Sequence, residues 1–376
     1  MSDAVRSPRR VSRVTCHVHH RVSHRITEAL VALGVDSVLV ESGRTVRQLR
    51  KARPFGLPGS IVRLDDAPAE VFRVTVPVDA EATVVATLIR AAELDAPGRG
   101  SIFSQRIDEY GEAEPPRIAA PPDAEPRRTL LRDLTLITCI LSMAGSGEQM
   151  ARVALDLGSC VPVVTLGTGT GVRDRLGLLR ITVPPDKEIV HLLVPEHDAN
   201  EIMRLLIEEG RLDRPGRGFV YRTPVEAGLL DTSLRIGKQD HAASIEQIIA
   251  AVDELKRGTG WRKRFATIDP HGGDPTRLLR LDNREIALVC SEGRAGRLVD
   301  AAIAAGAGGA TTSRIRRLPI ADTEGGVAAR ERSTISVPGD IVEPVISAMV
   351  DAGAISEEFG GRIQVLDAPA AFSHRS

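Results

Sequence analysis

Aromatic residues, cysteine pairs and net charge are scarce in this sequence. Only 3% of its 376 residues are aromatic, and the formal net charge is −1. With so little net charge, the chain is not expected to bind nucleic acid or anionic membranes through bulk electrostatics. The 4 cysteines form no CxxC pair, which favours buried thiols in a reducing cytoplasm.

Long apolar runs are also missing. No run approaches the roughly 20 residues that a membrane-spanning helix needs. The opening MSDAVRSPRR has no apolar core of the kind found in signal peptides. We therefore expect a soluble, cytoplasmic protein without membrane insertion. The hydrophobic content of 42% is too high for a disordered chain, and the length has room for two or three domains.

What the sequence does contain is a repeated turn. PGRG begins at Pro97 and again at Pro215, and the looser FGGR begins at Phe359. A short β-branched run that ends in cysteine precedes each turn, at Cys16, Cys139 and Cys290. This spacing predicts three diverged copies of one unit, with the cysteines at a common repeat position.

Each copy shows the same order of expected elements. In the second copy, strands are expected over 135–143, 161–166, 188–195 and 219–225, and helices over 145–159 and 198–212. The resulting order βαββαβ is that of the ferredoxin-like fold. We therefore predict an α+β protein with three tandem domains of this kind, over residues 11–110, 130–236 and 283–369.

The arrangement of these domains follows from their faces. An antiparallel sheet with both helices on one side leaves its other side to be covered. Three such sheets in one chain can cover each other around a pseudo-threefold axis, and we expect a monomeric pseudo-trimer. Residues 111–128 are expected to link the first two copies. An amphipathic helix within 241–265 either braces the next link or docks a partner.

The repeated turn has features of an anion-binding site. Its glycines allow left-handed backbone angles and close approach of a ligand, and successive N–H groups can form an anion nest. The intervening arginine adds a donor fork that fits phosphate. The candidate residues are Gly98, Arg99, Gly100, Gly216, Arg217 and Gly218. The alternative is a glycine helix stop with a solvated arginine.

A second glycine-rich segment, GTGTGVRDRLG, follows the second strand of copy two. Copy one has ESGRTVRQL at the corresponding place, and no Walker motif occurs. We expect this segment to act with the turns in ligand binding. The candidate residues are Gly43, Arg47, Gly167, Gly169, Gly171 and Arg173.

These motifs resemble the PII signal-transduction family. Copy two is similar to it at GTGTGVRDRLG, the base of the T-loop, at PGRGFVY, the B-loop, and at TPVEAG. The resemblance implies PII-like domains that bind an adenine nucleotide (ATP, ADP, AMP or cyclic AMP) in inter-domain clefts. It implies a non-enzymatic regulator of a partner, such as a membrane transporter or a metabolic enzyme.

The chain departs from the family in two respects. It has no tyrosine in a T-loop, and the glutamine that helps to hold magnesium and 2-oxoglutarate has no clear counterpart. The resemblance therefore implies nucleotide binding rather than 2-oxoglutarate sensing. The alternative function is a structural or interaction protein whose repeats no longer bind a nucleotide. No nucleophile–base constellation favours an enzyme.

Four histidines crowd the end of the first strand. They are His17, His19, His20 and His24. Imidazoles can hold a metal ion where three or four ligands converge, but the aligned segment TCILSMAGSG retains none of them. We expect a solvated strand end and no metal.

Overall fold

The structure is a computed structural model. It describes residues 7–35, 37–52, 60–96, 98–111, 116, 118, 130–157, 160–171, 186–231, 279–319 and 328–373. Within these residues the chain forms six α-helices and one 14-stranded antiparallel sheet, and the expected α+β class is confirmed. No helix among them is long and apolar enough to cross a bilayer. The expected helix within 241–265 lies outside the described residues.

The elements fall into three successive groups, which we call units one, two and three. Unit one contains β1 (Arg9–His19), α1 (Ser23–Ala32), β2 (Ser37–Ala52), β3 (Ser60–Val76), α2 (Glu81–Ala92) and β4 (Gly100–Tyr110). Unit two contains β5 (Leu134–Leu141), α3 (Ser146–Asp156), β6 (Val163–Gly171), β7 (Asp186–Pro195), α5 (Ala199–Gly210), β8 (Gly218–Val225) and β9 (Ala227–Leu229). Unit three contains β10 (Asn283–Ser291), α8 (Ala295–Ala304), β11 (Gly309–Pro319), β12 (Ala328–Pro338), α9 (Val342–Asp351), β13 (Arg362–Ala368) and β14 (Ala370–Ser373).

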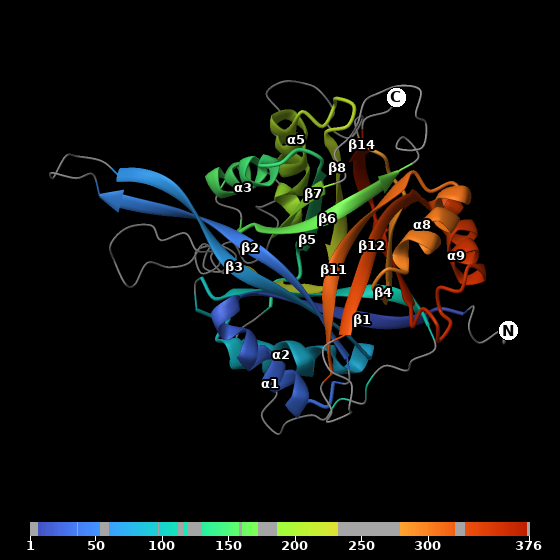
Figure 1. The fold of residues 1–376 in the computed structure, drawn as a ribbon. Coiled ribbons are helices and arrows are strands. Elements are labelled where there is room, and N and C mark those ends of the chain that lie inside the picture. Colours follow the sequence, from blue (N-terminus) through green and yellow to red (C-terminus); the bar gives the residue numbers. More distant parts are fainter. Residues whose placement is uncertain are drawn as a thin grey trace.

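The expected elements of the three copies all coincide with observed elements of the same kind, but some are longer. Strands β2 and β3 pair from Leu39 opposite Arg73 out to Ala52 opposite Ser60. This long hairpin projects from the body of the molecule (Figure 1). Strand β6 continues through the glycine-rich segment to Gly171.

Within each unit the strands have the same spatial order. The orders are β4-β1-β3-β2, β8-β5-β7-β6 and β13-β10-β12-β11. The three helix pairs lie on the outside and the strands face the middle (Figure 1). In α5, for example, Ile202, Leu206 and Ile207 are buried on one face, as expected for an amphipathic helix over a sheet.

The prediction of three separate sheets is wrong, because the units share one sheet. Strands β2, β6 and β11 pair with one another, β9 pairs with β4 of unit one, and β14 pairs with β8 of unit two. A four-stranded sheet by itself leaves unpaired N–H and C=O groups along its edges. Pairing across units satisfies these groups and makes the sheet continuous.

Alternation along the strands sends apolar side chains outward and polar ones inward. The side chains of β1 that enter the core of unit one are Val14, Cys16 and Val18. The alternate side chains line a cavity where the three units meet, and they are Arg13, Thr15 and His17. Because successive residues of a strand point to opposite faces, each unit has a dry core beneath its helices, and the molecule has a polar centre.

The four cysteines are free and buried, as expected. Cys16, Cys139 and Cys290, however, do not share the one repeat position that their spacing predicts. Val18 pairs with Gly100, and Leu141 pairs with Gly218, so Cys16 and Cys139 occupy matching positions. In β10, however, Val289 pairs with Arg362, which places Cys290 two residues further along the strand. A shift of two residues keeps the side chain on the same face of the sheet.

Candidate functional site

A cavity of about 260 Å3 lies between units three and one. On the side of unit one it is lined by Leu39 of β2 and by Arg73 and Thr75 of β3. On the other side the lining includes Arg317, Arg330 and Arg362. The cavity therefore brings together strands β2 and β3 of unit one and the glycine-rich turn of unit three.

Positive charge is concentrated in this cleft. Four arginines face it, against the single carboxylate of Glu357. Arg330 donates through Nη1 to Oγ of Ser291 at 3.1 Å and to the carbonyl of Gly360 at 3.0 Å. Burial lowers the pKa of Arg330, and the neighbouring Arg317 lowers it further. Several arginines that line one cleft attract an anion.

The turn in this cleft depends on its glycines. Gly360 has a left-handed φ of 51°. A Cβ on Gly361 would lie 1.9 Å from the carbonyl oxygen of Ala354. The preceding Phe359 is buried, and the guanidinium groups of Arg294 and Arg297 lie 5.7 and 5.5 Å from its ring centroid. The least regular of the three repeated turns therefore borders the arginine-lined cleft.

In unit two the corresponding turn is equally dependent on glycine. Gly216 has a φ of 73°, and a Cβ on Gly218 would lie 2.0 Å from the carbonyl oxygen of Ile140. The carbonyl of Arg217 accepts a hydrogen bond from the N–H of Ser142 at 3.1 Å. The guanidinium group of Arg217 contacts the sulfur of Met143.

The glycines of GTGTG form part of a strand and are not a loop. Gly169 pairs with Thr311 and Gly171 with Gly309 in β11, while a Cβ on Gly167 would lie 2.9 Å from the methyl group of Thr311. Glycine at these positions allows a strand of unit two and a strand of unit three to approach each other closely.

Lys187 lies between these two glycine-rich segments. A Cβ on Gly169 would lie 2.3 Å from Cε of Lys187, and Nζ of Lys187 donates to Oγ of Ser142 at 3.1 Å. In unit two, Leu141 pairs with Glu188, so the next residue, Ser142, lies opposite Lys187. In unit three, Ser291 pairs with Arg330. Lys187 and Arg330 therefore occupy matching positions, each opposite a serine. Both units thus hold a basic side chain on a serine beside the turn.

Unit one lacks this arrangement. The position that matches Lys187 is Ala69, which pairs with Gly43. The N–H of Gly98, whose φ is 79°, donates to Oδ1 of Asp231 at 2.8 Å. Asp231, from unit two, is only 6% exposed. The turn of unit one is therefore already occupied by a carboxylate of the protein itself.

The remaining candidates of unit one contribute little to a ligand site in this structure. Arg99 forms an ion pair with Glu93 at 3.0 Å. A Cβ on Gly100 would lie 2.0 Å from the carbonyl oxygen of His17, and one on Gly43 would lie 2.9 Å from that of Val164. Both glycines thus permit close packing of strands.

Two arginine candidates are not placed by the structure. Residue Arg173 lies outside the described residues, and of Arg47 only the backbone is described, within β2.

The glycine helix-stop alternative is wrong for both PGRG turns. Helix α2 ends at Ala92 and α5 at Gly210, and the residues that cap them, Glu93 and Arg211, adopt the left-handed conformation, with φ of 53° and 49°. The helices thus end before the turns begin, so the turn glycines are needed for the approach of the chain to the neighbouring strand.

The expected solvated strand end is only partly correct. His19, whose Nδ1 accepts from the N–H of Arg21, is half-buried, and His20 is exposed. His17 is buried, with its ring centroid 5.5 Å from that of Phe103. Within the described part of the chain, no cluster of three or more histidine, cysteine or acidic side chains is placed to hold a metal ion.

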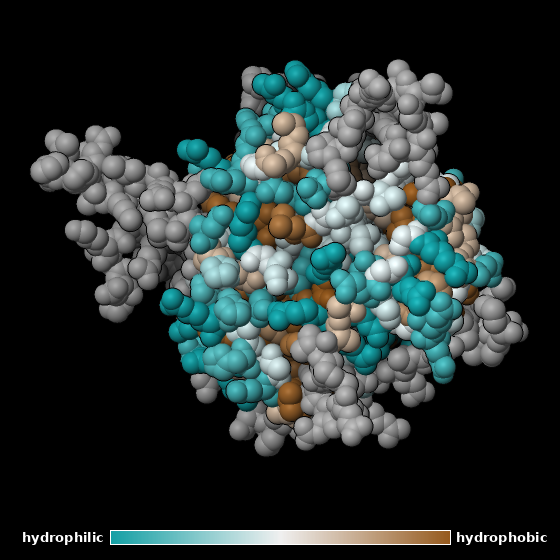
Figure 2. Space-filling model, in the orientation of Figure 1, coloured by the Kyte–Doolittle hydropathy of each residue, from teal (hydrophilic) through white to brown (hydrophobic). Residues whose placement is uncertain are grey.

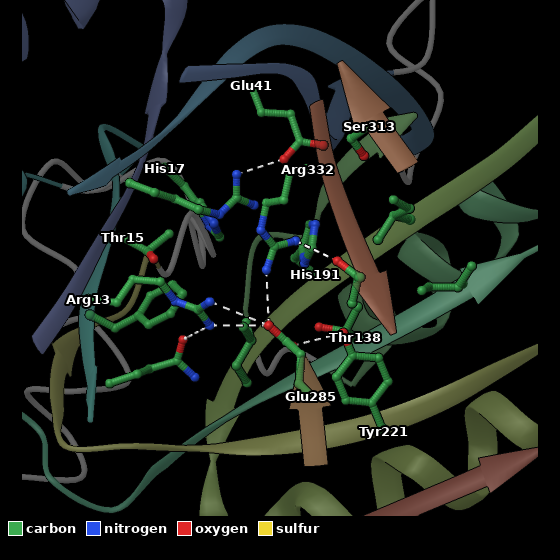
Figure 3. Close-up of a pocket in the computed structure, with 17 residues that line it drawn as sticks. Arg13, Thr15, His17, Glu41, Thr138, His191, Tyr221, Glu285, Ser313 and Arg332 are labelled. Atoms are coloured by element: carbon green, nitrogen blue, oxygen red, sulfur yellow. Dashed lines mark hydrogen bonds and ion pairs between the residues drawn. The ribbon is translucent and has the colours of Figure 1, made fainter. Parts of the chain in front are cut away.

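The polar centre is a second candidate site (Figure 3). It encloses a cavity of about 20 Å3 that is lined by residues of all three units. Glu285 lies 3.4 Å from Arg13 and 2.9 Å from Arg332, and Arg73 bonds to Glu41 at 2.7 Å. These five charged side chains are buried.

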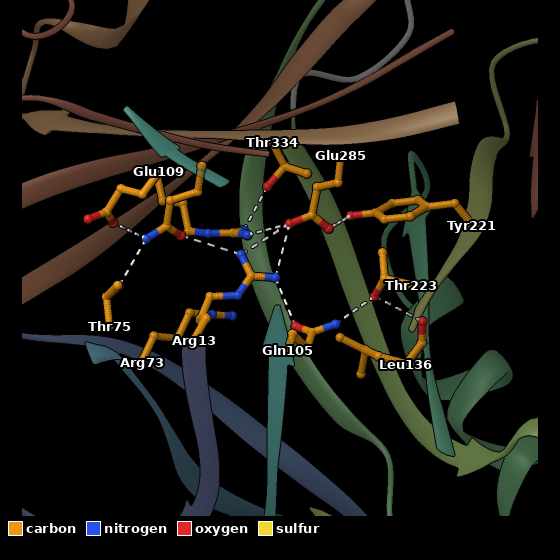
Figure 4. A network of polar contacts seen from close by, with 12 residues as sticks. Arg13, Arg73, Thr75, Gln105, Glu109, Leu136, Tyr221, Thr223, Glu285 and Thr334 are labelled. Carbon is orange, nitrogen blue, oxygen red and sulfur yellow. Dashed lines mark hydrogen bonds and ion pairs between the residues drawn. The ribbon is translucent and has the colours of Figure 1, made fainter. Parts of the chain in front are cut away.

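Hydrogen bonds extend the charged centre in both directions (Figure 4). Tyr221 donates to Glu285 at 2.9 Å, and Arg13 donates to Oε1 of Gln105 at 2.9 Å. On the other side, Gln364 donates to Glu109 at 2.9 Å. The network ties β1, β4, β8, β10 and β13 together, so it couples the three units.

Burial and charge set the ionisation of the centre. Burial lowers the pKa of Arg13 to about 10. Burial alone would raise the pKa of Glu285, but Arg13 and Arg332 bring it below its usual value. Burial, followed by the charge of Arg73, lowers the pKa of His191 to about 4. The imidazole is therefore neutral at pH 7, and the centre carries three positive and two negative side chains.

Several of these residues were missed by sequence reasoning. FGGR was recognised as a turn, but Arg362 and the two glycines before it were not selected as a site. Arg330 lies in a strand without any motif, and Arg317 was not selected as a site residue. The signal for Arg330 is that its position in β12 matches that of Lys187 in β7, which is recognised only when the strand pairing is known. Comparisons with known proteins found no family whose model matches this chain and no curated protein that matches it.

Proposed function

We propose that this chain is a PII-like regulator made of three ferredoxin-like repeats, and that it binds an adenine nucleotide between repeats. The identical strand order of the three units and their outer helix pairs support the repeats. The fused repeats would form a pseudo-trimer around the polar centre. The regulator would act on a partner protein and would not itself be an enzyme.

The observation that carries this proposal is the cleft between units three and one. Arg317, Arg330 and Arg362 line it together with a glycine-rich turn, and guanidinium groups and turn N–H groups are both suited to phosphate oxygens. Leu39, Val289 and Ile355 add apolar surface on which a base can lie. A small number of charged groups beside apolar surface is typical of a small-molecule site.

The three turns are expected to differ in affinity for a nucleotide. The turn of unit one bonds to Asp231, whose negative charge opposes that of a phosphate. The turn of unit two lies beside Lys187 and Arg217. The turn of unit three borders the arginine-lined cleft. We therefore expect a stoichiometry below three nucleotides per chain, with tightest binding between units three and one.

The partner would be contacted by the projecting hairpin of β2 and β3, which matches the T-loop of unit one in position. It extends away from the body of the molecule in Figure 1. On the face shown in Figure 2, hydrophobic residues form patches interrupted by hydrophilic ones. We therefore expect the projecting hairpin, rather than a broad apolar surface, to contact the transporter or metabolic enzyme.

Calorimetric titration with ATP, ADP, AMP and cyclic AMP tests the nucleotide proposal. Replacing Arg362 by glutamine should weaken binding by about ten- to a hundredfold, because a charge-assisted hydrogen bond contributes roughly 1.5–3 kcal/mol. Arg314→Gln is the matched control, since Arg314 is on β11 outside the cleft and its side chain is 88% exposed. Arg99→Gln should also bind as the wild type does.

The alternative is an interaction protein whose repeats have lost nucleotide binding. The carboxylate of Asp231 at the turn of unit one favours this alternative for that cleft. If no adenine nucleotide binds to the wild type, the alternative describes the whole chain. If Arg362→Gln binds a nucleotide as tightly as Arg314→Gln does, the nucleotide does not bind in the cleft between units three and one.

A further inference from the structure

The polar centre holds more positive than negative charge. Arg13 and Arg332 point into it from β1 and β12 (Figure 3), and Arg73 of β3 also lines it. Among the residues that the structure describes, two carboxylates, Glu41 and Glu285, lie within ion-pair distance of these guanidinium groups. All five side chains are buried. A buried charge without a partner is costly, so one further negative charge would stabilise the centre.

We propose that the central cavity binds one monatomic anion, such as chloride, between the guanidinium groups of the three units. This site is separate from the proposed nucleotide cleft, although Arg73 borders both cavities. The bound anion would supply the charge that the two carboxylates do not.

The hydrogen-bond donors of the centre support this proposal. Arg13 is 3% exposed, and its Nε has no hydrogen-bond partner, although its other nitrogens bond to Glu285, Gln105 and Gln364. Because guanidinium nitrogens only donate hydrogen bonds, this group requires an acceptor. Two neutral imidazoles, those of His17 and His191, also line the cavity.

The size of the cavity limits what can bind. A volume of about 20 Å3 has room for one water molecule or one ion of similar size. Phosphate, sulfate and nucleotides are too large. Water is the competing occupant, and it can donate to Oε1 of Glu41, which also has no partner. The excess positive charge favours an anion over water.

The excess positive charge of the centre can be neutralised by a substitution at Leu136 in unit two. Arg13 pairs with Gln105, Leu136 with Thr223 and Glu285 with Leu366, so these three residues of β1, β5 and β10 occupy matching positions. Leu136 also lines the cavity. A glutamate at this position would place the missing negative charge beside the arginines and remove the need for a bound anion.

The experiment compares thermal unfolding in chloride with unfolding in sulfate at the same ionic strength. Chloride from about 5 to about 200 mM should raise the wild-type Tm by about 2 °C or more relative to sulfate, because a ligand of the native state stabilises it. Leu136→Glu should lose this difference, whereas the uncharged Leu136→Gln should keep it.

Crystals grown in bromide provide a second measurement on the wild type. We expect an anomalous peak inside the cavity, within contact of Arg13 and Arg332. Equal Tm values in the two salts, or a bromide crystal with no peak at the centre, would mean that water fills the cavity, and the proposal would be wrong. Because this result concerns chloride alone, it does not depend on whether nucleotides bind.

Discussion

The buried histidines of the centre are single residues whose chemistry depends on their surroundings. His191 is enclosed by residues of all three units, and Arg73, Arg332 and Glu41 act on it. Its ring centroid lies 6.2 Å from that of His17. Protonating either ring would add a charge to a region that already holds an excess of guanidinium groups. Both histidines therefore favour the folded state only in their neutral forms.

Stability should accordingly fall in mild acid. The pKa of His191 is lowered to about 4 from 6.5, so between these values the unfolded chain binds a proton that the folded chain does not. The free energy of unfolding should be constant above about pH 7 and decrease by up to roughly 3 kcal/mol as the pH falls to about 4.

Urea unfolding between about pH 4.5 and 8 measures this effect, with His191→Gln as the variant that cannot titrate. The variant should show a shallower pH dependence than the wild type. The exposed His24 serves as control, and His24→Gln should not change the slope. Parallel curves for His191→Gln and the wild type would contradict the prediction.

At the scale of elements, the turn after α5 shows how a glycine fixes the start of a strand. Gly218→Ala should lower the free energy of unfolding by about 3 kcal/mol or more, because its Cβ would lie 2.0 Å from a carbonyl oxygen of β5. Gly145→Ala is the matched control: Gly145 also has a positive φ, of 80°, but open space surrounds its Cβ position. The control should cost only about 1–2 kcal/mol.

Urea unfolding of both variants measures the difference between them. Equal losses of stability would show that backbone conformation alone matters and that the strand does not approach the turn as closely as described.

Local patterns were sufficient to predict the elements but not their partners. The apolar spacing of residues such as Ile202 and Leu206 depends on neighbours three or four positions away, and it predicts a helix without knowledge of the fold. The pairing of Gly169 with Thr311 joins two units, and nothing in either segment identifies the other. For the same reason the PGRG turns could be recognised from the sequence alone, whereas Arg330, whose role depends on strand pairing, could not.

At the scale of the whole molecule, strand pairing across units predicts how the chain assembles. Because β2, β6 and β11 pair within one chain, the contacts that identical subunits would make in a trimer are already made internally. Analytical ultracentrifugation should therefore find a monomer over a wide range of concentrations. A tight trimer of full-length chains at every concentration would contradict this.

The side chains at the matching positions of the three units, Arg13, Leu136 and Glu285, limit how such units could assemble. A symmetric trimer must repeat the same side chain three times around its axis, and a ring of three arginines or three glutamates would repel itself. This chain instead places a cation, an apolar group and an anion at the matching positions. Three copies of unit one or of unit three around such a centre would bring three like charges together, which the single chain avoids.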